Sequence, residues 1–119
     1  MQTLEAIKTK LLEIKPYLQR TYHITELGVF GSYVRGEQTS ESDIDVLVEF
    51  DPSFRFGLST YSEMADYISE MADYISDTLG GKVDLVMKRA LKPYIGKQIL
   101  KEVIYLWSSE TFETTSTTS

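Results

Sequence analysis

Residues 43–50, with the sequence DIDVLVEF, constrain the fold more than any other part of the chain. Apolar side chains occupy every second position from Ile44 to Val48, a pattern that predicts a β-strand with one face in the core. Asp43 and Asp45 are two residues apart, so their carboxylates are expected on the opposite face. Two carboxylates side by side on an apolar strand repel each other unless a cation lies between them. For an isolated Asp-x-Asp pair, a strand with a solvated outer face is the commoner explanation.

A glycine-led turn precedes this strand. Residues 24–30 predict another strand that runs directly into Gly31 and Ser32, and residues 31–42 predict a loop rich in Gly, Ser, Glu and Thr. A glycine lets the backbone approach a phosphate closely, and Ser32 adds a backbone N–H and a hydroxyl. Arg35 can hold a phosphate or a carboxylate by two parallel hydrogen bonds. Gly-Ser pairs are common in ordinary turns, so only the combination with the acidic strand indicates a phosphate site.

A third acid lies on a third predicted strand, residues 83–87. Asp84 is the only acid among the apolar residues of this segment, where a carboxylate is costly unless it is paired, coordinated or exposed. It is either an edge residue facing water or the third acid of a site with Asp43 and Asp45. In the second case it would bind a metal ion and accept the proton of an attacking hydroxyl.

The remaining segments predict helices around these strands. Thr3 can cap a first helix with an apolar stripe, and Pro16 suits the start of a short second helix. Thr60 opens a capping box for a helix to Leu79, within which the heptad SEMADYI occurs twice in succession. A heptad insertion turns a helix by only about 20°, so the apolar face survives it. Pro93 begins a last helix to about residue 102, followed by a short strand.

Length and charge narrow the functional classes. The chain has 119 residues, enough for one domain, which we place at residues 1–107, followed by a disordered Ser/Thr-rich tail at residues 108–119. A net charge of −6 disfavours direct nucleic-acid binding. The chain contains no cysteine, and no apolar run approaches membrane-spanning length. We therefore expect a soluble cytoplasmic protein without disulfides or thiolate metal sites.

The spacing of the two motifs carries a family resemblance. Gly31-Ser32, ten residues, then Asp43-Ile44-Asp45 resembles the signature of the DNA polymerase β-like nucleotidyltransferase superfamily. The longer strings GSYVRG and SDIDVLVEF resemble its short prokaryotic members, the minimal nucleotidyltransferases. The string VDLVMKRALKPYIGKQILKEVIYL resembles their C-terminal part and places Asp84 at the third acid of the family. The repeated heptad and the Ser/Thr tail depart from the family pattern.

The resemblance implies an α/β fold, a small mixed β-sheet with helices packed on one face and the metal site on the other. It implies that the Gly31 backbone and Ser32 hold the triphosphate of ATP. Asp43 and Asp45 would bind two Mg²⁺ ions, with Mn²⁺ as an alternative, and Asp84 the ion that activates the acceptor. It further implies an antitoxin that transfers AMP to a tyrosine of a cognate HEPN-domain ribonuclease toxin and thereby neutralises it.

Two other functions remain open from the sequence. The same fold could neutralise a toxin by binding alone, or it could serve as a small-molecule nucleotidyltransferase that needs a partner subunit. Three converging acids favour an enzyme, because a pure binder has no need for them. Lys88 and its basic neighbours are interpreted as a solvated turn that could also contact phosphates or an acidic partner. His23 is interpreted as a surface histidine, whereas Trp107 could close the core or anchor a partner.

Overall fold

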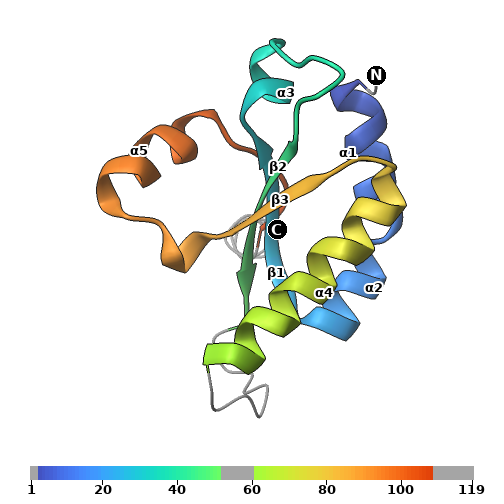
Figure 1. The fold of residues 1–119 in the computed structure, drawn as a ribbon, viewed down its shortest axis with the longest axis vertical. Coiled ribbons are helices and arrows are strands. Elements are labelled where there is room, and N and C mark those ends of the chain that lie inside the picture. Colours follow the sequence, from blue (N-terminus) through green and yellow to red (C-terminus); the bar gives the residue numbers. More distant parts are fainter. Residues whose placement is uncertain (1–2, 52–60, 109–119) are drawn as a thin grey trace, which may run out of the picture.

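A four-stranded mixed sheet forms the centre of the computed structural model, which describes residues 3–51 and 61–108 (Figure 1). The strand order is β3-β2-β1-β4. Strand β1 is antiparallel to both β2 and β4, whereas β2 and β3 are parallel. The strands are β1 (Ile24–Phe30), β2 (Ile44–Phe50), β3 (Val83–Met87) and β4 (Ile104–Trp107). The expected mixed α/β sheet is confirmed, and β1, β2 and β3 lie within one residue of their predicted bounds.

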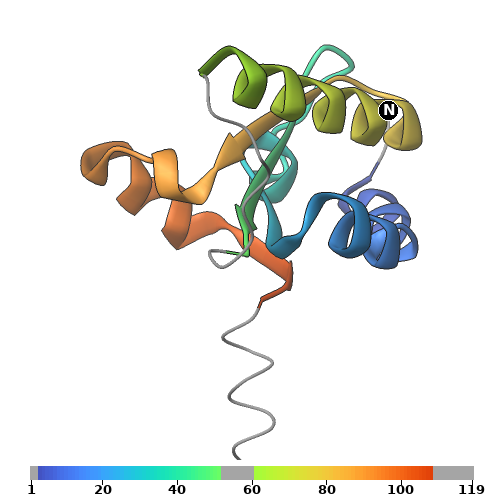
Figure 2. The same cartoon turned by 90° about the horizontal axis from the view of Figure 1, so that it is seen from below.

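Helices cover the two faces of this sheet unequally (Figures 1 and 2). Helices α1 (Leu4–Glu13), α2 (Lys15–Tyr22) and α4 (Tyr61–Leu79) lie together on one side, whereas α5 (Pro93–Glu102) lies on the other. Thr3 caps α1 as predicted, since its hydroxyl oxygen accepts a hydrogen bond of 3.1 Å from the N–H of Ala6. The face next to α5 carries Asp45, which lines a cavity together with residues of that helix.

The hydrophobic core lies between the sheet and the three-helix side. In β2 the side chains of Ile44, Val46 and Val48 are at most 1% exposed, and they pack with residues of α1, α2 and α4. The alternating apolar residues of β2 therefore face the core, as the sequence pattern predicts. The polar residues of β2 are left on the opposite face.

The duplicated heptad lies within one continuous helix. Helix α4 contains both copies, and Met71 and Ile75 from the second copy are completely buried. Ile68 of the first copy packs against the same core, as the small rotation per heptad predicts. Gly80, with φ of 72°, follows the helix directly and ends it. The predicted cap Thr60 lies outside the described residues.

One predicted loop contains a helix, so the prediction of a loop over residues 31–42 was wrong in part. Helix α3 (Ser32–Arg35) is a single turn in which the carbonyl of Gly31 accepts hydrogen bonds from Val34 and Arg35. Gly31 and Gly36 flank it with φ of 82° and 73°. The helix begins after Gly31 and ends before Gly36 because positive φ angles are incompatible with a right-handed helix. A helix of one turn is too short to leave a periodic pattern in the sequence.

The predicted tail at residues 108–119 lies outside the described residues from residue 109 onward. Ser108 is described, and its hydroxyl donates a 2.8 Å hydrogen bond to Glu26 of β1. This first residue of the predicted tail therefore contacts the sheet. No helix among the described residues has the length and apolar character needed to cross a membrane.

Candidate functional site

The strand register brings the predicted acids to one end of the sheet. Asp45 of β2 lies opposite Phe30, the last residue of β1, and next to Asp84 of the parallel strand β3. Asp43 comes one residue before β2, where its carboxylate lies 4.0 Å from the ammonium of Lys82. The turn at Gly31 follows Phe30 directly, so the two predicted motifs meet at this end of the sheet. We call this end, with Asp43, Asp45 and Asp84, the acidic edge.

The carboxyl group of Asp45 lies in an unfavourable electrostatic environment. Its pKa is raised from 3.8 to about 6, chiefly by burial and then by the nearby carboxylates of Asp84 and Asp43. Arg35 opposes the shift and Glu102 adds to it. Within the described part of the chain, no hydrogen bond or ion pair reaches the Asp45 side chain. A negative charge at this position is therefore poorly compensated by the protein itself.

Gly31 is the residue against which Asp45 packs. A Cβ atom added to Gly31 would fall 1.9 Å from Oδ2 of Asp45, closer than any two such atoms can approach. The backbone at Gly31 also has φ of 82° and ψ of −152°, a conformation that side chains strongly disfavour. Both the contact with the acid and the geometry of the turn require glycine at this position.

A fourth acid, which the sequence reasoning missed, holds the predicted phosphate-binding groups. The N–H of Gly31 donates a 2.5 Å hydrogen bond to Oε2 of Glu102, at the end of α5. Nη1 of Arg35 lies 3.0 Å from each carboxylate oxygen of Glu102, and its Nε lies 2.9 Å from Glu37. Because Glu102 lies 71 residues beyond Gly31, no local pattern in the sequence could reveal this contact.

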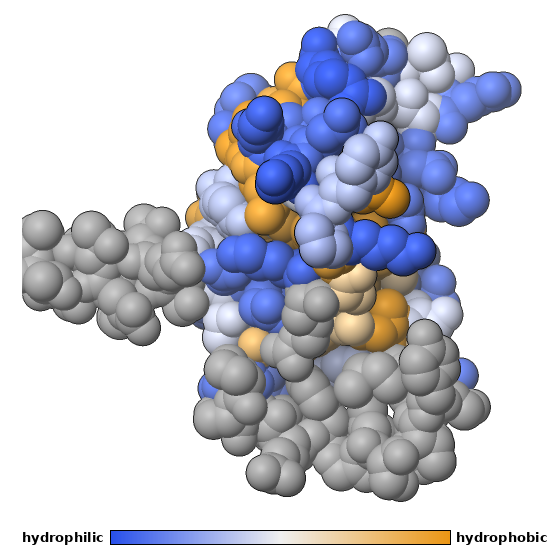
Figure 3. All heavy atoms as spheres, turned by 90° about the vertical axis from the view of Figure 1, so that its left-hand side faces the viewer, coloured by the Kyte–Doolittle hydropathy of each residue, from blue (hydrophilic) through white to orange (hydrophobic). Residues whose placement is uncertain are grey.

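An open cavity of about 210 Å³ lies beside Asp45. One wall comes from the end of β1, the turn, α3 and β2, and the other from one side of α5. Seen from the side of α5, the surface alternates between hydrophilic and hydrophobic patches (Figure 3). The lining residues are Phe30, Gly31, Arg35, Asp45, Ile95, Gln98, Ile99 and Glu102. The cavity thus joins the acidic edge to the turn and has room for a small part of a ligand.

The model of the Nucleotidyltransferase domain family matches residues 11–106. The chain belongs to this family. Protein adenylyltransferase MntA of Thermococcus cleftensis is 43% identical over 108 residues, which cover 89% of this chain and 98% of that protein. Residues 11–106, which the family model matches, include all the elements that build the acidic edge.

Two solved structures share the fold. A structure described as a toxin–antitoxin with AMP-PNP gives a TM-score of 0.63 at 24% identity and covers 85% of this chain and 73% of the solved chain. A second is described as tri-AMPylated Shewanella oneidensis HEPN toxin in complex with MNT antitoxin. It gives a TM-score of 0.60 at 18% identity and covers 92% of this chain and 76% of the solved chain. At these identities the likeness concerns the fold alone.

The acids fit a metal ion only together with other ligands. Among the described residues, no group of three or more His, Cys, Asp and Glu side chains forms a set that could hold a metal ion. Asp43, Asp45 and Asp84 offer oxygen atoms only, and their mutual repulsion is what a cation would relieve. Mg²⁺ prefers six oxygen ligands and usually keeps waters or phosphates among them. The donor set therefore suits Mg²⁺ that is bound jointly with nucleotide phosphates.

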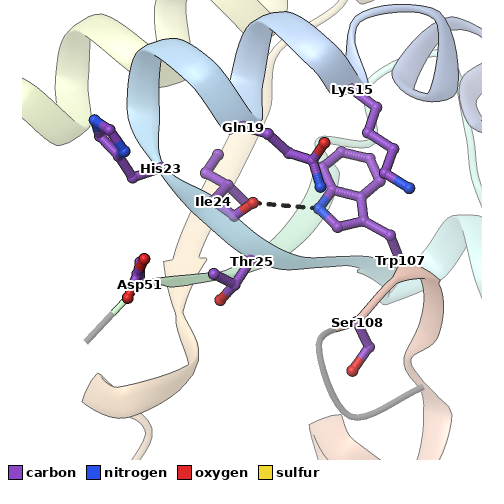
Figure 4. Close-up of a pocket in the computed structure, with 8 residues that line it drawn as sticks. All are labelled: Lys15, Gln19, His23, Ile24, Thr25, Asp51, Trp107 and Ser108. Atoms are coloured by element: carbon purple, nitrogen blue, oxygen red, sulfur yellow. Dashed lines mark hydrogen bonds between the residues drawn. The ribbon is translucent and has the colours of Figure 1, made fainter. Parts of the chain in front are cut away.

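A second cavity, of about 230 Å³, lies near the end of α2 and is separate from the acidic edge (Figure 4). Nε1 of Trp107 donates a 3.4 Å hydrogen bond to the carbonyl of Ile24, and the ammonium of Lys15 lies 5.5 Å from the indole centroid. Trp107 is only 7% exposed, so it closes the core. His23 also lines this cavity, in a left-handed conformation at the end of α2.

Proposed function

We propose that this chain transfers AMP from ATP to a tyrosine hydroxyl of a cognate HEPN ribonuclease toxin and so acts as its antitoxin in the cytoplasm. The observation that carries the proposal is the poorly compensated Asp45 carboxylate between Asp84 and the Gly31 turn. The similarity to a protein named protein adenylyltransferase supports it, as do folds shared with structures described by AMP-PNP and by an AMPylated HEPN toxin.

Each residue of the acidic edge has a role in this proposal. The N–H of Gly31 and the hydroxyl of Ser32 would hold phosphate oxygens, and Arg35 would add its guanidinium. Asp43, Asp45 and Asp84 would hold two Mg²⁺ ions, for which Mn²⁺ is a substitute. When bound, Mg²⁺ would neutralise the charge that develops on the phosphates. The acids and the turn would thus grip the same triphosphate from two sides.

The reaction would be an in-line displacement at the α-phosphorus. The acceptor oxygen forms a bond to phosphorus, the bond to the bridging oxygen of pyrophosphate breaks, and pyrophosphate leaves with that electron pair. Asp84 would accept the proton of the acceptor hydroxyl. Its side chain is exposed on the edge strand β3, so a protein acceptor can reach it from solvent.

Neutralisation by binding alone is the second candidate. The observation that favours it is Glu102, whose carboxylate fills the position at Gly31 and Arg35 that phosphates would need. A binder that never accepts a nucleotide could keep this contact permanently. A small-molecule transferase would instead need a partner subunit to supply the acceptor surface.

The test uses ATP labelled at the α-phosphate, Mg²⁺ and the HEPN protein encoded by the neighbouring reading frame. The proposal expects label on the HEPN protein, located on tyrosine by peptide mass spectrometry. The double variant Asp43→Asn, Asp45→Asn should bind the partner and leave it unlabelled. Inhibition of the toxin without any label would contradict the proposal and support neutralisation by binding.

A further inference from the structure

Glu102 is an anion built into the proposed nucleotide site. Its carboxylate accepts the N–H of Gly31 at 2.5 Å, and both of its oxygens lie 3.0 Å from Nη1 of Arg35. A backbone N–H and a guanidinium that converge on two oxygens are also the donors that a phosphate group takes. The carboxylate therefore lies where the proposed function needs a phosphate oxygen.

The contact is partly shielded from solvent and adds to the negative charge of the site. The side chain of Glu102 is 25% exposed, compared with 47% for Arg35, so solvent weakens but does not remove their attraction. The charge of Glu102 is also close enough to disfavour ionisation of Asp45. A triphosphate that entered while Glu102 stayed in place would meet Asp43, Asp45, Asp84 and a fourth carboxylate.

We propose that Glu102 competes with the nucleotide for Gly31 and Arg35 and thereby sets the affinity of this chain for nucleoside triphosphates. This inference rests on the proposed function. In the ligand-free protein the carboxylate holds the turn and the guanidinium in place. When a triphosphate binds, its oxygens take over both donors and the carboxylate turns away. The side chain has several rotatable bonds, so this exchange requires no movement of α5 as a whole.

Competition of this kind lowers the apparent affinity by the fraction of molecules in which the site is free. If the contact is formed in about nine molecules out of ten, its removal should tighten binding about tenfold. Glu102→Gln keeps the size of the side chain and removes its charge. Glu37→Gln is the matched control, because Glu37 binds the other side of the Arg35 guanidinium and has no hydrogen bond to Gly31.

The experiment measures the Kd of ATP with Mg²⁺, and of inorganic triphosphate, by calorimetry on the full chain. We expect Glu102→Gln to bind both ligands about tenfold more tightly than the parent chain, and Glu37→Gln to stay within about twofold. Unchanged or weaker binding by Glu102→Gln would overturn the inference and leave the proposed function intact. If neither the parent chain nor Glu102→Gln binds ATP, the proposed function fails as well.

A second measurement on the unmodified chain covers the case in which Glu102→Gln does not fold. With ¹³C-labelled glutamate, the side-chain carboxyl resonance of Glu102 should move on addition of inorganic triphosphate, because it loses Gly31 and Arg35. The resonance of Glu37 serves as the internal reference. A Glu102 resonance that stays fixed while triphosphate saturates the protein would contradict the exchange.

Discussion

Two acids on the same face of the sheet are held in opposite ways. The register pairs Glu26 with Glu49 and Phe30 with Asp45, so Glu26 and Asp45 share the face next to α5. Glu26 is only 5% exposed, yet its carboxylate is fully engaged: Lys88 lies at 3.0 Å and the hydroxyl of Ser108 at 2.8 Å. Asp45 has no such partner within the described residues, and its pKa is raised to about 6.

The difference separates a structural ion pair from a site that is incomplete without a ligand. Burial alone would lower the pKa of Lys88, but the hydrogen bond to Glu26, the charge of Glu26 and the contribution of Tyr105 together outweigh that effect, and the pKa is raised. The opposite charges of Lys88 and Glu26 thus compensate each other within the protein. The charge of Asp45 costs folding free energy instead, and a cation bound there would recover that cost.

The largest expected effect is the loss of AMP transfer in Asp45→Asn. Removal of the carboxylate should reduce the rate at least about 100-fold, the scale seen when one electrostatic group of a transition state is deleted. The free energy of unfolding should stay constant or rise, because repulsion among the acids is relieved. Both quantities are measured on the same preparation, by label transfer and urea unfolding. Full activity of Asp45→Asn would contradict the view that Asp45 belongs to a ligand site.

Gly31→Ala should impair both stability and transfer. The added Cβ meets Oδ2 of Asp45 and also strains the backbone, so we expect a loss of about 3 kcal/mol in the free energy of unfolding. Gly36→Ala is the matched control, since Gly36 also has a positive φ but nothing lies within 4 Å of its added Cβ. It should cost only about 1 kcal/mol and leave the transfer rate near normal. Equal losses in the two variants would show that the contact with Asp45 is unimportant.

Glu26→Gln tests the other member of the comparison. Lys88 would keep its partly buried position without a charged partner, which should lower the free energy of unfolding by about 2 kcal/mol. Transfer of AMP should proceed at nearly the normal rate in the folded variant, because Glu26 takes no part in the acidic edge. A stable but inactive Glu26→Gln protein would show that the two acids are not separate in function.

A smaller effect is expected in the pH dependence of stability. The folded pKa of Asp45 is about 6 and its ordinary value is 3.8, so the folded protein binds this proton more tightly than the unfolded chain does. The resulting stabilisation is complete below about pH 4 and disappears as the pH rises through 6. The free energy of unfolding of Asp45→Asn, relative to that of the parent chain, should therefore rise by about 1–2 kcal/mol from pH 4 to 7. Urea unfolding of both proteins without Mg²⁺ at several pH values measures this change. A difference in unfolding free energy that does not vary with pH would contradict the raised pKa of Asp45.

The sequence was enough to predict where Asp45 and Asp84 lie, because the patterns that place them are local. The alternation around Asp45 determines which face its carboxylate occupies, and the single acid in residues 83–87 identified Asp84. Their adjacency follows once β2 and β3 pair in parallel. Local patterns could not reveal the contact of Glu102 with Gly31, which spans 71 residues.

The basic turn illustrates the same limit. Lys88 was interpreted as part of a solvated cluster, but its ammonium is bound to Glu26, 62 residues earlier in the chain. The solvated interpretation was wrong for Lys88, since only the folded sheet brings its ammonium next to Glu26. Ser108, predicted to belong to the tail, completes the same pair for the same reason.

Mn²⁺ binding, measured by electron paramagnetic resonance in the presence of ATP, tests most directly whether Asp45 and the acidic edge bind a cation. The account predicts that the parent chain and Glu26→Gln bind Mn²⁺ alike, because Glu26 already has its partner. It predicts that Asp45→Asn binds Mn²⁺ at least about tenfold more weakly, although the protein is folded. Equal Mn²⁺ affinity in the parent chain and Asp45→Asn would contradict the account.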